Sequence, residues 1–119
     1  MTEIQKSKRY DLEERTLEFA KRVRDFVRKL PGGIINIEDA KQLIRASGSV
    51  GANYIEANES FSKKDFALRV KICRKEAKES RYWLRLTQPL KERVYEKESL
   101  IKESTELMKI FGSMVEKSK

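Results

Sequence analysis

The length of 119 residues allows one core, so residues 1–119 are expected to form a single domain. Apolar and charged residues each make up 39% of the chain, with only five Gly and two Pro, and this composition favours helices with charged outer faces. The chain has no histidine and one cysteine, which excludes an internal disulfide, a histidine-containing zinc site and the usual general base of hydrolases. We therefore expect no catalytic residues, no metal ligands and no cofactor.

The first predicted helix covers residues 11–30, where apolar residues recur at intervals of three and four. Asp11 and Glu14 have the spacing of a capping box, which places the start of this helix at Asp11. Pro31 disfavours helical geometry in the residue before it, and two glycines follow, so the helix is expected to end at Leu30.

The second predicted helix covers residues 37–58, with Asn36 as its N-cap. Its centre contains Gly48 and Gly51, and a glycine inside a helix costs on the order of 1 kcal/mol relative to alanine. We expect that another backbone approaches the helix closely here and leaves no room for side chains, which would explain the two glycines. A phosphate-binding loop is a poor explanation, because no strand precedes the glycines and the Gly-Lys-Ser/Thr ending is missing.

Two further helices complete the predicted fold. Ser62 and Asp65 have capping-box spacing and begin a helix over residues 63–87, which ends before Pro89. Residues 91–97 form a charged connection, and apolar spacing then predicts the last helix over residues 97–116. Amphipathic helices with short connections predict an all-α, antiparallel up-down-up-down four-helix bundle.

The third predicted helix has more apolar surface than a solitary bundle needs. At about 100° per residue, one sector faces the core and contains Cys73, which we interpret as a small apolar residue and not as a nucleophile. A second apolar sector predicts a contact between subunits, unless the first or fourth helix covers it within the chain. The predicted oligomer interface consists of Leu68, Ile72, Glu76, Glu79, Trp83 and Leu86, with Asn53 and Glu56 on the second helix.

Asn53 and Glu56 lie three residues apart and so share a helix face next to the glycines. Without a histidine or a second carboxylate beside them, they do not form a catalytic pair. We expect instead a buried hydrogen bond or a contact with an arginine of another subunit.

A third sector of the same helix is basic. Residues 62–93 contain eleven Lys and Arg against four Asp and Glu, so this segment alone has a net charge of +7. Such a strip can bind phosphates through counterion release without reading base sequence; the alternatives are a solvated face or pairing with acidic residues of a neighbour. The predicted strip consists of Lys63, Lys71, Arg74, Lys78, Arg81 and Arg85.

Residues 42–86 resemble the bacterial four-helix bundle proteins related to the 23S rRNA-intervening sequence protein. The resemblance depends on Arg45 with Ala46, Asn53 with Glu56, residues 64–66 and residues 79–84, in that order. It implies a homo-oligomer, typically a pentameric barrel, with a positively charged surface and no catalytic residues. The chain is also similar to the accessory variability determinant of diversity-generating retroelements, which implies a reverse transcriptase and nucleic acid as partners.

Together these features predict a cytoplasmic, non-enzymatic homo-oligomer that binds the backbone of RNA or DNA through the basic strip. The cytoplasmic location is expected because no apolar run approaches the roughly 18 residues of a membrane span, and residues 1–8 lack the apolar middle of a signal peptide. The alternative function is a protein-interaction scaffold, whose basic face docks an acidic protein partner without nucleic acid.

Overall fold

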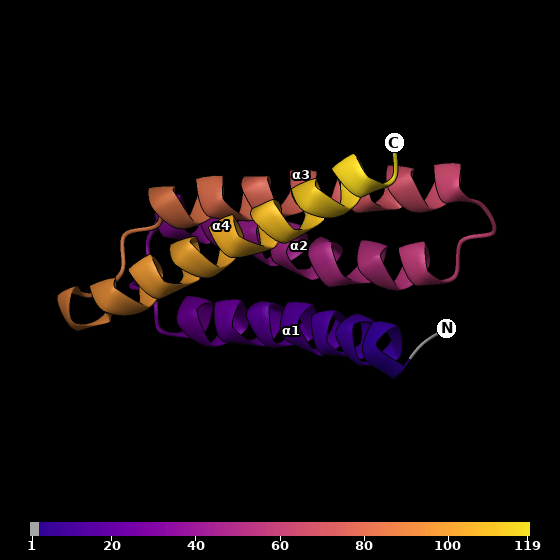
Figure 1. Ribbon diagram of the computed structural model, residues 1–119. Coiled ribbons are helices and arrows are strands. Elements are labelled where there is room, and N and C mark those ends of the chain that lie inside the picture. The colour runs from indigo at the N-terminus through magenta and orange to yellow at the C-terminus, as the bar shows by residue number, and fades with distance from the viewer. Residues whose placement is uncertain (1–2) are drawn as a thin grey trace.

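Four long α-helices make up most of the described chain, and each packs antiparallel to the next (Figure 1). The computed structural model describes the backbone of residues 3–119 and the side chains of residues 11–119, so Met1 and Thr2 of the predicted domain lie outside it. Contacts are dense between the second, third and fourth helices and sparse between the first and the fourth. The predicted all-α antiparallel bundle is confirmed. Its elements are α1 (Glu3–Arg28), α2 (Ile34–Asn58), α3 (Lys63–Leu86), the 3-10 helix η1 (Lys91–Arg93) and α4 (Val94–Lys117).

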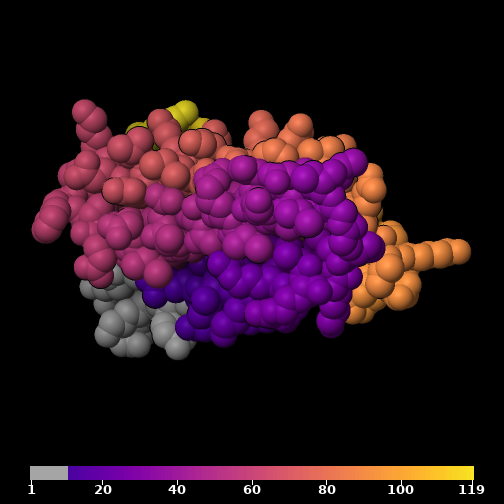
Figure 2. Space-filling model, turned by 180° about the vertical axis from the view of Figure 1, so that it is seen from behind, coloured from indigo at the N-terminus to yellow at the C-terminus, as the bar shows by residue number. Residues whose placement is uncertain are grey.

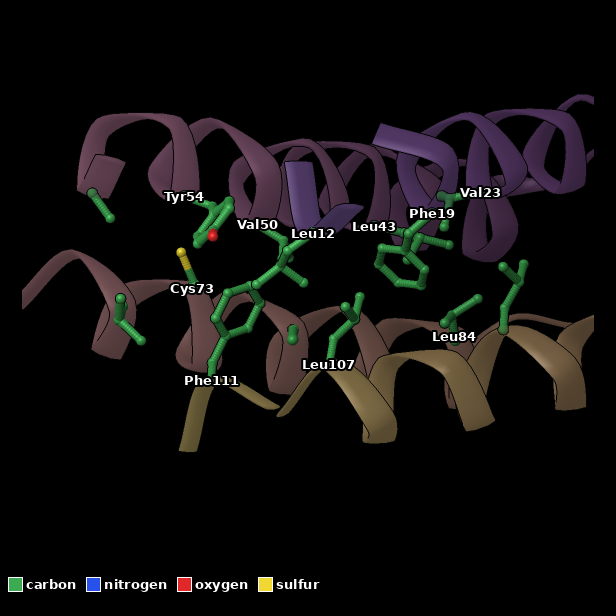
Figure 3. Packing of buried hydrophobic residues seen from close by; sticks show 14 of the residues in the cluster. Leu12, Phe19, Val23, Leu43, Val50, Tyr54, Cys73, Leu84, Leu107 and Phe111 are labelled. Carbon is green, nitrogen blue, oxygen red and sulfur yellow. The ribbon is translucent and has the colours of Figure 1, made fainter. Parts of the chain in front are cut away.

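The core lies between two layers, α1 with α2 and α3 with α4 (Figure 3). The ring of Tyr54 on α2 faces that of Phe111 on α4, with ring centroids 5.8 Å apart (Figure 3). The predicted core face of α3 is confirmed, because five of its six residues are fully buried and Phe66 packs against the edge of the core. The five buried residues are Val70, Cys73, Ala77, Ser80 and Leu84.

Cys73 has the chemistry expected of a buried core residue. Desolvation raises the pKa of its thiol to about 12, so the thiol stays protonated near neutral pH. Because the thiolate is the reactive form of cysteine, Cys73 is a poor nucleophile in the folded protein.

The glycines of α2 face α1. A Cβ atom on Gly51 would lie 2.9 Å from Oγ1 of Thr16 and 3.7 Å from its carbonyl carbon, so α1 occupies the space that a side chain would need. A Cβ atom on Gly48 would meet only the Nη2 atom of Arg24, at 3.6 Å. The predicted close approach is therefore confirmed at Gly51, whereas Gly48 faces a flexible side chain.

The predicted starts of α1 and α2 are wrong. α1 begins at Glu3, so Asp11 and Glu14 lie inside the helix and do not cap it. The residues before Asp11 are mostly Glu, Gln, Lys and Arg, which favour helix, and no Gly or Pro interrupts them. α2 begins at Ile34 and its N-cap is Gly33, whose φ of 123° lies in the region that favours glycine.

Asn36 is buried and has a tertiary role in place of the predicted capping role. Its Nδ2 atom donates hydrogen bonds to the carbonyl oxygens of Pro31, at 3.1 Å, and Gln88, at 3.0 Å. Its Oδ1 atom accepts a hydrogen bond from the backbone N–H of Gln88 at 2.9 Å. Asn36 therefore holds the turn between α1 and α2 against the segment that follows α3.

The start of α3 agrees with the prediction and the start of α4 does not. Oγ of Ser62 accepts a hydrogen bond from the backbone N–H of Asp65 at 3.0 Å, which confirms Ser62 as the N-cap. The segment 91–97 is not a connection, because η1 and the first turn of α4 occupy it. It consists largely of Lys, Glu and Arg, which are good helix formers.

The ends of the bundle differ in shape. The start of α1 and the end of α4 lie at one end (Figure 1). At the opposite end, the beginning of α4 projects beyond the other helices, as Figures 1 and 2 both show. Seen from behind, α1 and α2 form much of the surface (Figure 2).

No helix in the described part of the chain has a stretch long and apolar enough to cross a membrane.

Candidate nucleic-acid interface

The predicted basic strip lies on the side of α3 that borders α4. Nη1 of Arg81 donates a hydrogen bond to Oγ1 of Thr105 on α4 at 3.2 Å. The side chain of Arg74 passes over α4 at Gly112, where a Cβ atom would lie 3.6 Å from Cδ of Arg74. From its first to its last residue the strip follows about 33 Å of helix. Arg81 is half-buried, and Lys63, Lys71, Arg74, Lys78 and Arg85 are exposed.

None of these six basic side chains forms an ion pair with a residue that the structure describes. Three carboxylates of α4, all after its first turn, form ion pairs, but with residues outside the strip. Their ion pairs are Glu103 with Arg15 at 2.8 Å, Glu106 with Lys109 at 3.7 Å and Glu116 with Lys119 at 3.1 Å. Contacts among residues 11–119 therefore leave the positive charge of the strip unneutralised.

A surface hollow continues the strip at the N-terminal end of α3. Lys63, Lys64 and Lys71 line it, together with Asp65 and Ser118. Three ammonium groups against one carboxylate keep this end of the strip positive.

The second apolar sector of α3 is only partly buried. Leu68 is 57% exposed and Leu86 is 42% exposed, while Ile72 and Trp83 are half-buried. Trp83 packs against the edge of the core and donates a hydrogen bond from Nε1 to Oε1 of Glu79 at 3.3 Å. Among residues 11–119, neither α1 nor α4 covers the two leucines, so the alternative to a subunit contact does not hold for them.

The acidic members of this sector pair with Arg45 on α2. Nη1 of Arg45 lies 3.5 Å from Oε2 of Glu76, which is buried, and Nη2 of Arg45 donates to Oε1 of Glu79. No local pattern in the sequence points to Arg45 as their partner, because the pairing depends on how α2 packs against α3. With these carboxylates paired, the exposed part of the sector is mainly apolar.

Asn53 also has its partners within the chain. Its Nδ2 atom donates to the carbonyl oxygen of Ser49 at 2.9 Å, and its Oδ1 atom accepts from Nη1 of Arg69 on α3 at 3.2 Å. The arginine that binds Asn53 thus belongs to the same chain. Glu56 is exposed and forms no ion pair with any described residue.

Comparison with known proteins identifies the family. The family model of the 23S rRNA-intervening sequence protein matches residues 8–113. The fold is similar to the crystal structure of a protein of unknown function from the S23 ribosomal protein family of Bacteroides thetaiotaomicron, with a TM-score of 0.71 and 32% sequence identity. That match covers 87% of this chain and 96% of the other. No curated protein matches the sequence. The chain therefore belongs to the 23S rRNA-intervening sequence protein family.

Proposed function

We propose that this protein is a non-enzymatic homo-oligomer that binds the phosphate backbone of RNA or DNA through the basic strip of α3. The observation that supports this most strongly is the row of basic side chains without ion-pair partners among the described residues. Unneutralised charge in a row suits a linear polyanion, and releasing the polyanion's counterions supplies the binding free energy. The contacts of the six basic side chains are with phosphates, so different base sequences bind alike.

A salt titration tests this proposal. The affinity for unrelated nucleic acids is expected to fall about 10³-fold between about 50 mM and 200 mM salt, because six phosphate contacts give a slope of roughly −5 in log K against log salt. Fluorescence anisotropy with two labelled oligonucleotides of different sequence measures both the slope and the lack of sequence preference. Absent binding at low salt, or an affinity that salt does not change, contradicts the proposal. Retention of an acidic protein after nuclease treatment, without binding of purified nucleic acid, supports the scaffold alternative.

We place the subunit contact at the exposed leucines of α3. Leu68 and Leu86 lie on the apolar sector beside the paired carboxylates, and a subunit that covers them removes apolar surface from water. The family resemblance favours a pentamer. The apolar sector does not determine the angle between subunits, so the subunit number has to be measured.

Replacing both leucines with glutamate is expected to lower the oligomeric state. The Leu68→Glu/Leu86→Glu variant should approach the 14.0 kDa mass of one chain in light scattering, because each new charge would be buried in the contact. Leu17→Glu on α1 is the matched control, since Leu17 is an exposed leucine outside the sector. A monomeric unmutated chain, or an unchanged mass of the double variant, contradicts this contact.

A further inference from the structure

Tyr82 is an exposed aromatic residue within the basic surface of α3. Its side chain is 58% exposed, with Lys78 four residues before it and Arg85 three residues after it, so the three share one helix face. Its ring meets the ring of Trp83 edge-on, with centroids 5.1 Å apart and an interplanar angle of 80°. Trp83 is itself packed against the core, so it supports the tyrosine ring while leaving much of that ring in solvent.

An aromatic ring between two cations distinguishes single strands from duplexes. A duplex presents phosphates but keeps its bases paired and stacked, so they offer no free face to a side chain. A single strand can turn a base outward onto an aromatic ring while neighbouring basic side chains hold its phosphates, and such stacking tolerates any base. Tyr82 meets both requirements, because its ring is exposed and Lys78 and Arg85 flank it.

We infer that Tyr82, Lys78 and Arg85 form a site for single-stranded nucleic acid, in which an unpaired base stacks on the tyrosine ring. This inference rests on the proposed function, because it names the class of nucleic acid that the same strip binds. Phosphates contact the strip in both classes, and the stack on Tyr82 adds affinity for unpaired bases alone.

The test compares Tyr82 variants on three probes of equal length: oligodeoxythymidine, its duplex with oligodeoxyadenosine, and an abasic strand. Tyr82→Ala is expected to weaken binding of oligodeoxythymidine about 5- to 150-fold, the range that one base–aromatic stack provides. Binding of the duplex and the abasic strand should stay within about twofold, with the salt slope unchanged, because the phosphate contacts remain. Tyr82→Phe should bind like the unmutated chain. Tyr95→Ala is the matched control, since Tyr95 is 75% exposed on the first turn of α4, outside the strip.

The outcomes separate the two claims. If no probe binds in a salt-dependent way, the proposed function fails. If the probes bind but Tyr82→Ala weakens all of them equally, weakens none, or lowers the particle mass, the inference fails and the proposed function stands. Should Tyr82→Ala melt at a lower temperature, Tyr82→Leu replaces it, because leucine keeps an apolar side chain without an aromatic face.

Discussion

Reversing three charges of the strip, with Lys71→Glu, Lys78→Glu and Arg85→Glu, is expected to weaken nucleic-acid binding at least about 100-fold at physiological salt. The three side chains are exposed, and no ion pair or side-chain hydrogen bond with a described residue depends on them. The substitutions therefore remove phosphate contacts and add repulsion without removing a stabilising interaction. The salt slope should become less steep by about 3, since each lost contact contributes about 0.9.

A control variant separates the strip from net charge. Lys21, Lys29 and Lys102 are also exposed but lie on α1, in the turn after it and on α4. Changing these three to glutamate lowers the net charge from +8 to +2, the same change that the strip variant undergoes. The control should retain most of the affinity and most of the slope. Equal losses in both variants would mean that overall charge, and not the strip, attracts the polyanion.

Two of the features predicted correctly from the sequence depend mainly on neighbours within one helical turn. The core face of α3 follows from apolar spacing, and Ser62 caps the helix through an atom only three residues away. The capping-box spacing of Asp11 and Glu14 shows the limit of such signals. The same two residue types at the same spacing also fit inside a helix. Only a helix-breaking Gly or Pro before Asp11 would have made the helix begin there.

The contacts that sequence analysis missed join residues far apart in the chain. Asn36 is a common N-cap residue, but its partner Gln88 lies 52 positions away, and only the packing of the helices brings the two together. Arg45 likewise finds Glu76 across 31 positions. No local pattern contains either pairing, so both require the arrangement of the helices.

In the candidate site, too, the local features were predictable from the sequence and the long-range contacts were not. Charge counting and helical periodicity located the basic strip, but whether α4 would neutralise it depended on where Glu103 and Glu106 point. Both carboxylates pair elsewhere, Glu103 with Arg15 and Glu106 with Lys109. Tyr82 was missed because the strip was defined by charge alone. The signal was present, since the spacing to Lys78 and Arg85 already puts the three on one face.

The position of α3 in the bundle is compatible with both proposed contacts. It packs against both α2 and α4, so its core face and both flanks have fixed neighbours. The α2 flank carries the ion pairs of Arg45, the α4 flank carries the basic strip, and the outward side presents the exposed leucines. The proposed subunit contact and the proposed phosphate contacts therefore use different residues of α3.

Gly51→Ala is expected to destabilise the bundle by about 1–2 kcal/mol, although alanine is the better helix former. The new Cβ atom would lie 2.9 Å from Oγ1 and 3.3 Å from Cβ of Thr16. Thr16 cannot easily move aside, because it is buried and its Oγ1 atom donates to the carbonyl oxygen of Leu12 at 3.0 Å. The overlap therefore outweighs the roughly 1 kcal/mol gained in helix propensity. Chemical denaturation at one fixed protein concentration measures the change, since oligomer stability depends on concentration.

Gly48→Ala is the matched control, and its expected effect has the opposite sign. Its Cβ atom would lie 3.6 Å from Nη2 of Arg24, an ordinary contact with the end of a flexible side chain. The variant should therefore gain about 0.5–1 kcal/mol of stability from helix propensity. Adding Thr16→Ala to Gly51→Ala should recover part of the loss, because it removes the nearest atom, Oγ1. A stabilised Gly51→Ala variant, or strictly additive effects of the two substitutions, would show that α1 and α2 are not in close contact at this point.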